Sequence, residues 1–549
     1  MQRWPLRYWS LKLVSLGGMS LAVFALPHLM PGQPVTLYES WPVNAQQRAH
    51  LISEYGFDYR LSTQYVIWLQ RLLTGQWGSS RYSNRPVLYE SWRATRLTLL
   101  LFLWTLLAWG LGATVLWGMR RLAPWLGPLL PRSKLLHILE ALPTFLVAVC
   151  LRELVLWQLG WVSMASVPLF EPYYFLSPVY MLLPASILAL TPLRIWYTRP
   201  PELDAQRPLL RQRWHYFRRL FHPHLESFLL DMSLTEYVFA FPGLGGLGIE
   251  ALQRRDLPLL QGFILCMGAL YFVLRCLCEP AQSHPAFSPT STPGLHPTGR
   301  AVYNGLWCLL ILGVIAVWAP SLLRYDPMEI HSRDQFLAPG YRYTLGTDFL
   351  GRDVLSRTIE GFRSSIPRVL CLTALIGGMS WLGFGYQRGR RRLLSLVWRG
   401  GLTLLHAIPS FMLAFMVFVV FEHHSWALDI ALTIACLPVA AQLLTGETTL
   451  IQRVAQLAQL GGLVLLLEVT FYFLNLSSES FIPTWGSDIR HGMHYGHINI
   501  WMVLAPACAV LWSRYSLYQL SHGFPHRPPP AICNHSSTTT PCEGEDATA

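Results

Sequence analysis

Long apolar runs recur along the whole chain, and they restrict its possible folds more than any other feature. Residues 97–119, 302–323 and 500–520, for example, reach the roughly 20 residues that a helix needs to cross the hydrocarbon of a bilayer. Because lipid offers no hydrogen-bond partners, such runs are expected to form helices that satisfy their own backbone. Charged residues make up only 13% of the chain, against about 25% in soluble domains. The sequence therefore predicts an all-α polytopic membrane protein.

About twelve membrane helices are expected. Pro143 and Pro409 each lie inside one of the apolar runs, where proline is tolerated by neighbouring helices and is expected to produce a kink. Residues 64–80, in the polar segment after the first run, carry apolar and aromatic side chains at helical spacing, which is typical of a helix lying on a membrane surface. The expected membrane helices cover residues 9–26, 97–119, 135–156, 179–196, 225–241, 259–277, 302–323, 369–384, 402–421, 428–444, 460–476 and 500–520.

The distribution of arginine predicts the orientation of the chain. The formal net charge is +12, and nearly all the basic residues are arginines. They gather in short loops beside apolar runs rather than in one patch of a soluble domain, so the charge indicates a lipid bilayer and not a nucleic acid as the partner. The clusters after the second, fourth and eighth runs place those loops in the cytoplasm. Both termini are then cytoplasmic, and residues 345–357 lie on the outer face.

Short matches between the two halves of the chain indicate a duplication. The matching pairs occur in the same order: 90–93 with 360–363, 141–145 with 407–411, and 236–241 with 468–473. Two parallel repeats are typical of a transporter whose pathway lies between them, and a duplicated scaffold is the alternative. We expect a first unit over 1–278, a Pro/Ser/Thr-rich linker over 279–300, a second unit with a shortened cytoplasmic region over 301–521, and a disordered cytoplasmic tail over 522–549.

Several motifs resemble a known family of transport proteins. Residues 64–80 and 241–248 resemble the first permease of peptide-type ABC importers, the group that handles dipeptides, oligopeptides and nickel. Residues 345–357, 407–411 and 482–486 resemble the second permease of the same systems. The chain thus resembles a fusion of two permease subunits. The resemblance implies two tandem six-helix type I importer units in a bacterial inner membrane, served by separate ABC ATPase subunits and an extracytoplasmic solute-binding protein.

The resemblance also implies two functional surfaces. An outer-surface motif close to the binding protein consists of Gly346, Thr347, Asp348, Gly351, Arg352 and Asp353. A cytoplasmic coupling loop in contact with an ATPase consists of Arg207, Arg211, Arg213, Arg218, Arg219 and His222. The family's coupling pattern is degenerate in the first unit and shortened in the second. A permease-derived scaffold or sensor that has lost ATPase coupling is therefore the alternative function, and peptides, nickel, sugars and polyamines all stay open as substrates.

Neither catalysis nor a cofactor is expected in this chain. A phosphate-binding loop needs a lysine directly after glycine so that the ammonium group reaches the phosphates. The only lysines are Lys12 and Lys134, and neither follows a glycine. Any ATP would therefore bind to partner subunits.

For the other candidate residues, a structural role is favoured over a functional one. His491, His494 and His497 could bind a metal if their segment is helical, but a solvated outer loop is favoured and no metal site is predicted. Glu236 and Glu468 lie within apolar runs, where a buried carboxylate is a candidate for function. We favour the interpretation that each marks the end of a helix near the membrane interface.

Overall fold

The computed structural model describes most of the chain as helices. The described residues are 6–38, 44–122, 143–158, 178–198, 218, 221–278, 299–388, 392–406, 408–444, 450–476 and 482–522. Within these residues the structure has no β-strand, and each of two isolated β-bridges closes a short loop. The all-α prediction is confirmed for this part of the chain.

Residues 1–278, called the first half, contain nine described α-helices. Short 3₁₀ turns and one π-helical turn, Glu153–Gln158, connect or extend them. The α-helices are α1 (Leu6–Leu29), α2 (Ala45–Tyr55), α3 (Leu61–Leu73), α4 (Val87–Leu122), α6 (Thr144–Arg152), α7 (Pro178–Thr198), α9 (Leu225–Val238), α10 (Leu244–Gln253) and α11 (Leu257–Cys278).

Residues 301–521 are called the second half. They contain the remaining described α-helices, although the first of these begins at Gly299 and the last ends at His522. They are α12 (Gly299–Leu322), α13 (Val354–Arg388), α14 (Arg392–Leu405), α15 (Ser410–Phe421), α16 (Ala427–Leu443), α17 (Leu450–Phe473), α18 (Trp485–Tyr495) and α19 (Trp501–His522).

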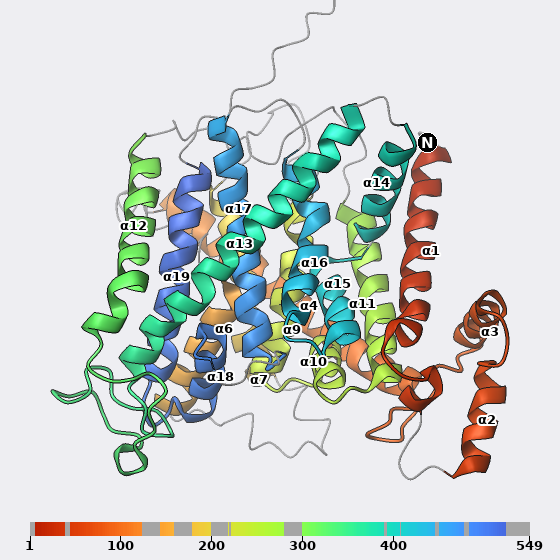
Figure 1. The fold of residues 1–549 in the computed structure, drawn as a ribbon, viewed down its shortest axis with the longest axis horizontal. Helices are drawn as coiled ribbons and strands as arrows, with labels where there is room; N and C mark the ends of the chain where they lie inside the picture. The colour runs from red at the N-terminus through yellow and green to blue at the C-terminus, as the bar shows by residue number, and fades with distance from the viewer. Residues whose placement is uncertain are drawn as a thin grey trace, which may run out of the picture.

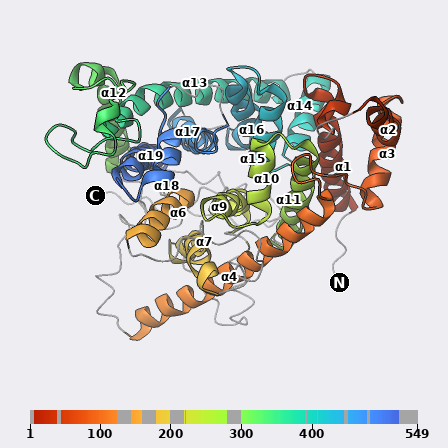
Figure 2. The ribbon, with the colours of Figure 1, turned by 90° about the horizontal axis from the view of Figure 1, so that it is seen from below.

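The long helices run between the same two ends of the molecule. Figure 1 shows α1, α12, α13, α17 and α19 extending from one end to the other, with α2 and α3 standing beside the lower part of α1. Seen from below, α4 and α13 form two opposite edges, and the shorter helices α6, α9, α10 and α18 lie between them (Figure 2). The loop before α13 and the short helices α10 and α18 are at the lower end in Figure 1, the end predicted to be extracellular.

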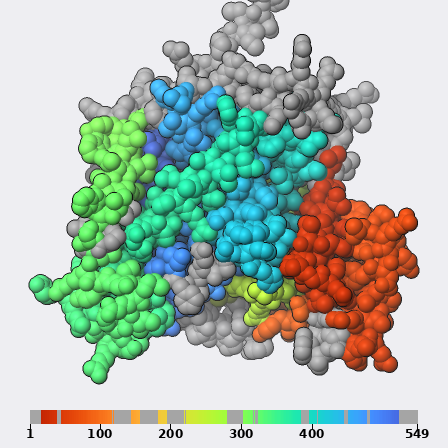
Figure 3. All heavy atoms as spheres, in the orientation of Figure 1, coloured from red at the N-terminus to blue at the C-terminus, as the bar shows by residue number. Residues whose placement is uncertain are grey.

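Exposed apolar side chains give the helices a surface suited to lipid. Four helical segments are long and apolar enough to cross a membrane: Val87–Val115, Leu257–Cys278, Val354–Gly383 and Leu450–Phe473. The exposed side chains on α12 include Trp307, Leu310, Val314 and Trp318. Figure 3 shows α12, α13, α14 and α1 side by side on one face. Apolar surface of this extent is characteristic of contact with a membrane. The described structure therefore supports a multi-pass membrane protein, and the number twelve stays a prediction.

Two proline positions differ from the expected kinks. Pro409 does not lie inside a continuous helix, because α14 ends at Leu405 and α15 begins at Ser410, with the two axes at 99°. Proline disfavours helical backbone in the residue before it, so a helix commonly ends there and a new one can begin after it. Pro143 likewise has extended backbone and precedes the first residue of α6. Residues 123–142 lie outside the described part, so the predicted helix before Pro143 is not tested.

Candidate functional site

The outer-surface motif folds into a tight polar loop before α13. Thr347 and Asp353 face each other across an isolated bridge. The Asp348 carboxylate accepts hydrogen bonds from the backbone N–H groups of Leu350 and Arg352, each at 2.9 Å, and from Arg352 Nε at 2.8 Å. The carboxylate of Asp353 accepts from the N–H of Ser356 and caps the start of α13. The polar side chains of the motif therefore stabilise its own backbone.

Gly346 and Gly351 allow the sharp turns of this loop. Their φ angles are +77° and +79°, a region that side chains with a Cβ adopt only at a cost. A Cβ on Gly351 would also overlap the carbonyl oxygen of His331. All six predicted motif residues are thus brought together in one loop, although their contact with a binding protein stays a prediction.

We expect Gly351→Ala to destabilise this loop by about 2 kcal/mol or more, because the substitution combines a strained backbone with a steric clash. Thermal unfolding of the purified protein measures the effect. Gly340→Ala is the matched control in the same segment, since a Cβ there would meet its nearest atom, the Ala338 oxygen, only at 3.8 Å. Equal melting temperatures for the two variants would contradict the expected role of Gly351.

Residues far along the chain fix the motif in place. Asn499, just before α19, donates from Nδ2 to the carbonyl oxygens of Leu345 at 3.2 Å and Thr347 at 3.3 Å. Arg357, in the first turn of α13, donates from Nε to Asp488 Oδ1 of α18 at 3.0 Å, and from its Nη2 as well. Burial raises the pKa of Asp488, and the nearby Arg357 opposes that shift. The motif and α18 therefore form one unit.

His491 packs against the motif. Its ring lies 5.1 Å from the ring of Phe349, centroid to centroid, and its Nε2 is 3.3 Å from Arg490 Nη2. Burial lowers the pKa of His491 to about 4, and the charges of Arg490, Arg357 and Arg352 add to this shift. The imidazole is therefore neutral at physiological pH and acts as a packing group.

A pH dependence of stability follows from His491. Because the unfolded chain takes up a proton near pH 6.5 and the folded protein only near pH 4, protonation favours unfolding. The stability that His491 contributes is present above about pH 6.5 and is lost as the pH falls from there toward about 4. Melting temperatures across this window should fall less steeply for His491→Gln than for the wild type. The exposed His50 supplies the control His50→Gln, which should keep the wild-type slope; a His491→Gln slope equal to the wild type's would refute the assignment.

A second loop of the same construction precedes α4 in the first half. Ser79 and Pro86 form the bridge, as Thr347 and Asp353 do in the second half. The N–H of Val87 donates to the Gly78 oxygen at 2.9 Å, and in the second half the N–H of Val354 donates to the Gly346 oxygen at 3.1 Å. Asn84 has a φ of 54° where the other loop has Gly351.

This second loop is also attached to the last helix of its half. The hydroxyl of Ser80 donates to the carboxylate of Asp256, which precedes α11, and the N–H of Tyr82 donates to the same oxygen at 3.3 Å. Asp256 in turn accepts from the N–H of Leu259 in the first turn of α11. Ser80 and Asp256 are 1% exposed, so both loops end in buried polar contacts. We call the two segments, 78–87 and 345–354, the paired outer loops.

Buried carboxylates occupy comparable places in the two halves. Glu236 of α9 is fully buried and accepts a hydrogen bond from Thr98 Oγ1 of α4 at 2.6 Å and from the N–H groups of Gly245 at 2.7 Å and Gly246 at 3.2 Å. Glu468 of α17 is 1% exposed and accepts from Ser365 Oγ of α13 at 3.0 Å. Each carboxylate therefore joins helices within its own half. The interpretation favoured from the sequence, a helix end near the membrane interface, does not include these contacts.

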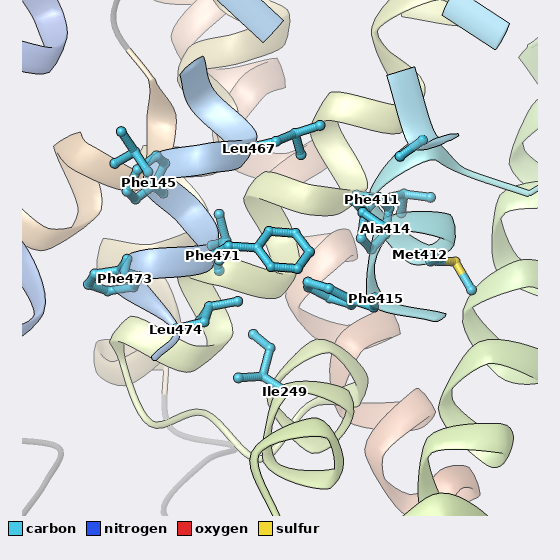
Figure 4. Packing of buried hydrophobic residues seen from close by; sticks show 14 of the residues in the cluster. Phe145, Ile249, Phe411, Met412, Ala414, Phe415, Leu467, Phe471, Phe473 and Leu474 are labelled. Atoms are coloured by element: carbon cyan, nitrogen blue, oxygen red, sulfur yellow. The ribbon is translucent and has the colours of Figure 1, made fainter. Parts of the chain in front are cut away.

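Buried aromatic side chains from both halves pack together, and Figure 4 shows Phe145, Phe415, Phe471 and Phe473 among them. Phe145 of α6 lies 5.8 Å from Phe473 of α17, and Tyr237 of α9 lies 5.9 Å from the same ring. Phe415 of α15 lies 5.4 Å from Phe471 of α17. We call these five residues the aromatic layer. The rings of the aromatic layer pack against one another and make this contact between the halves apolar.

Polar contacts join the halves on either side of the aromatic layer. Gln253 Nε2 donates to the carbonyl oxygen of Leu474 at 2.8 Å. Glu226 accepts from both the hydroxyl of Ser410, at 2.9 Å, and its N–H, at 3.3 Å, at the start of α15. A more exposed pair, Arg255 and Glu422, has a 3.2 Å separation. These contacts join the halves through hydrogen bonds and one ion pair.

The predicted coupling loop lies mostly outside the described residues. Arg207, Arg211, Arg213 and Arg219 belong to that undescribed part. Arg218 is described as helical and interacts electrostatically with Cys278 at the end of α11, and His222 lies in the 3₁₀ turn before α9. The coupling loop therefore stays a prediction.

Comparison with known proteins points to one class of function. No family model matches the chain. A putative peptide transport system permease protein of Brucella suis is 25% identical over 257 residues, which cover 41% of this chain and 86% of that protein. The glutathione transport system permease protein GsiC of Salmonella typhimurium is 27% identical over 285 residues, 47% of this chain and 88% of that protein. The dipeptide transport system permease protein DppB of Escherichia coli is 26% identical over 330 residues, 51% of this chain and 96% of that protein.

The chain is related to peptide-transport permeases. The predicted resemblance to peptide-type permeases is thus confirmed at low identity and over part of the chain, whereas the fusion of two permease units stays a prediction. Each of these permeases is matched over most of its own length but accounts for only about half of the present chain. The relatives are transport proteins, and the apolar helices described above agree with a permease in a membrane.

Proposed function

We propose that the chain is a fused permease of an ABC transporter that moves peptides or a similar small solute across the bacterial cytoplasmic membrane. The observation that carries this proposal is the repetition of one construction in both halves. Each half has an outer loop closed by the same bridge and attached to the start of its last helix. Together with relatives that account for about half of the chain, this repetition favours two tandem permease units joined by the linker at 279–300.

The solute would pass between the two units. The aromatic layer and the flanking polar contacts lie on this route, so opening it requires the halves to separate there. A change between two such conformations needs a difference in binding energy between them. In an ABC system, separate subunits that hydrolyse ATP supply it, and an extracytoplasmic binding protein delivers the solute to the paired outer loops.

Loss of ATPase coupling is the competing function, and purification discriminates between the two. The full chain, tagged and isolated from its own membrane under mild conditions, is expected to bring down an ABC ATPase subunit and to hydrolyse ATP as a complex. An intact complex that contains no ATPase would overturn the transport proposal and favour a scaffold or sensor.

The coupling loop has its own test. We expect Arg213→Glu combined with Arg218→Glu to reduce the recovered ATPase by about tenfold, because two charge reversals weaken a docking surface that relies on arginine. Arg254→Glu is the control: Arg254 is similarly cationic and forms a surface pair with Glu250 at 3.0 Å, at the predicted outer face. Quantitative mass spectrometry of the purified complexes measures the ratio. Unchanged ATPase recovery with the double variant would exclude this loop as the docking site.

A further inference from the structure

Glu226 of the first half holds the start of a helix in the second half. Its carboxylate lies in the first turn of α9 and accepts hydrogen bonds from the hydroxyl of Ser410, at 2.9 Å, and from the N–H of Ser410, at 3.3 Å. Ser410 is the first residue of α15, and Pro409 in the cap position has no hydrogen-bonding side chain. The N–H groups of a first helical turn need partners and favour negative charge. The first half therefore supplies the cap of α15.

The same carboxylate is anchored within the first half. Glu226 Oε1 accepts from the hydroxyl of Tyr271 of α11 at 3.0 Å, and Arg275 Nη1 donates to that hydroxyl oxygen at 3.2 Å. The arginine thus orients the hydroxyl so that its proton points to Glu226. Because Oε1 is bound within the first half and Oε2 across the interface, Glu226 can release the second half and keep its anchor.

The duplication makes this contact one-sided. Glu226 lies ten residues before Glu236, and Ala458 lies ten residues before Glu468, the matching glutamate of the second half. Ala458 is 7% exposed, and its methyl group accepts no hydrogen bond. An alanine at this position cannot cap α6, which is the counterpart of α15 in the first half. One carboxylate in one half therefore carries the whole of this interaction.

The Glu226 contact lies toward the end of the molecule that is predicted to be cytoplasmic. α11 begins at Leu257, directly after α10 at the lower end of Figure 1, and Tyr271 follows about 21 Å farther along the helix. At the outer end, the halves are joined by the neutral hydrogen bond of Gln253 and by the ion pair of Arg255, which is 61% exposed. Hydrogen bonds to a charged group are about twice as strong as neutral ones, and exposed ion pairs contribute little. The cytoplasmic end therefore has the stronger contact.

We propose that Glu226 is a latch that keeps the cytoplasmic end of the interface between the halves closed in the resting protein. This end opens when the two hydrogen bonds to Ser410 break while the bond to Tyr271 stays. Opening then leaves the first turn of α15 without its cap, directly after the bend at Pro409. This inference rests on the proposed function in placing the solute pathway between the halves. It adds the residue that determines which end is closed at rest.

A buried cysteine beside the latch reports whether the interface is open. Cys436 of α16 is 0% exposed and interacts electrostatically with Glu226. A buried thiol reacts only when it becomes accessible, so its rate of alkylation follows the population of the open state. The experiment adds a membrane-impermeant maleimide to inside-out membrane vesicles that contain the full chain. Mass spectrometry of the peptide that contains Cys436 measures the rate.

Glu226→Ala is expected to raise the labelling rate of Cys436 at least about tenfold, because a hydrogen bond to a charged group changes an equilibrium by that factor or more. Ser227→Ala is the matched control on the same helix, since its exposed hydroxyl bonds only to the His224 oxygen, and it should leave the rate unchanged. The same reagent added to right-side-out vesicles should show no such rise, because the latch closes the cytoplasmic end.

A second cysteine separates a latch from a general structural role. Cys278 at the end of α11 is also buried, and a general loosening of the fold would raise the labelling of both cysteines. If Glu226→Ala is not recovered in membranes, Ser410→Ala removes one of the two bonds and should give a smaller rise, at Cys436 alone. Unchanged labelling of Cys436, an equal rise at Cys278, or a rise only in right-side-out vesicles would overturn the proposal.

The outcome is separable from that of the proposed function. An ATPase that co-purifies with a chain whose Cys436 labelling does not depend on Glu226 would refute the latch and leave the transport proposal standing. Labelling that depends on Glu226 in a chain without any ATPase would support the latch and refute ATP-driven transport.

Discussion

Replacing Arg357 by methionine is expected to destabilise the protein by about 3–5 kcal/mol. Arg357 and Asp488 have side chains that are 7% and 10% exposed. Removing one partner of a buried ion pair leaves the other charge without compensation, at about that cost. Within the described part of the chain, Asp488 Oδ2 has no hydrogen-bond partner, so the remaining carboxylate would have little to stabilise it. Thermal or denaturant unfolding of the purified chain in detergent measures the loss.

The double variant Arg357→Met with Asp488→Leu supplies the control. Because it removes both charges, it should recover much of the stability that the single variant loses. Arg363→Met, which breaks the exposed pair with Glu360, should change stability by less than about 1 kcal/mol. If Arg357→Met were as stable as Arg363→Met, the ion pair would not be what holds the outer motif to α18.

Glu236→Ala is expected to have a comparable effect, about 3–5 kcal/mol. Three donors point at this carboxylate: the Thr98 hydroxyl and the N–H groups of Gly245 and Gly246. The two N–H groups belong to the first turn of α10, where a negative charge is favoured by the helix dipole. Each buried donor left without a partner costs about 1–3 kcal/mol. The start of α10 should become mobile, which hydrogen exchange of its amides detects.

Glu468 of the second half is the matched comparison. Among the described residues it accepts one hydrogen bond, from Ser365, and its second carboxylate oxygen has no hydrogen-bond partner there. Glu468→Gln keeps an acceptor for Ser365 and should therefore be tolerated better than Glu236→Ala. Amide exchange in α10 that is unaffected by Glu236→Ala would show that the carboxylate does not organise this helix.

The apolar runs predicted the helices well, but less so where a helix carries polar residues. α4 begins at Val87 and α13 at Val354, ten or more residues before the runs from which they were predicted. Their first turns hold buried polar residues, such as Glu90 and Ser356. Hydropathy alone misses such turns because the side chains are buried against the outer loops of their own half and not against lipid.

The outer motif was predicted from its residues, whereas its attachment was not. Gly346 and Gly351 signal turns locally. Asp488 and Asn499, which hold the motif, lie 131 and 154 residues along the chain from Arg357 and Leu345, their partners. Long-range polar pairs of this kind leave no local pattern, so the sequence alone does not reveal them. The histidines at 491 and 494 could have suggested a metal, but the packing of His491 on Phe349 gives it a different use.

The paired outer loops are attached to their last helices by hydrogen bonds of opposite direction. In the first half the acid is Asp256, before the last helix, and its partner in the loop is the hydroxyl of Ser80. In the second half the donor is the amide of Asn499, before the last helix, and the acceptors are the backbone oxygens of Leu345 and Thr347 in the loop. If this loop docked on the last helix of the first half, its carbonyl oxygens would face the carboxylate of Asp256 with no donor between them, and acceptors repel each other. The hydrogen-bonding groups of each loop are therefore matched to the last helix of its own half.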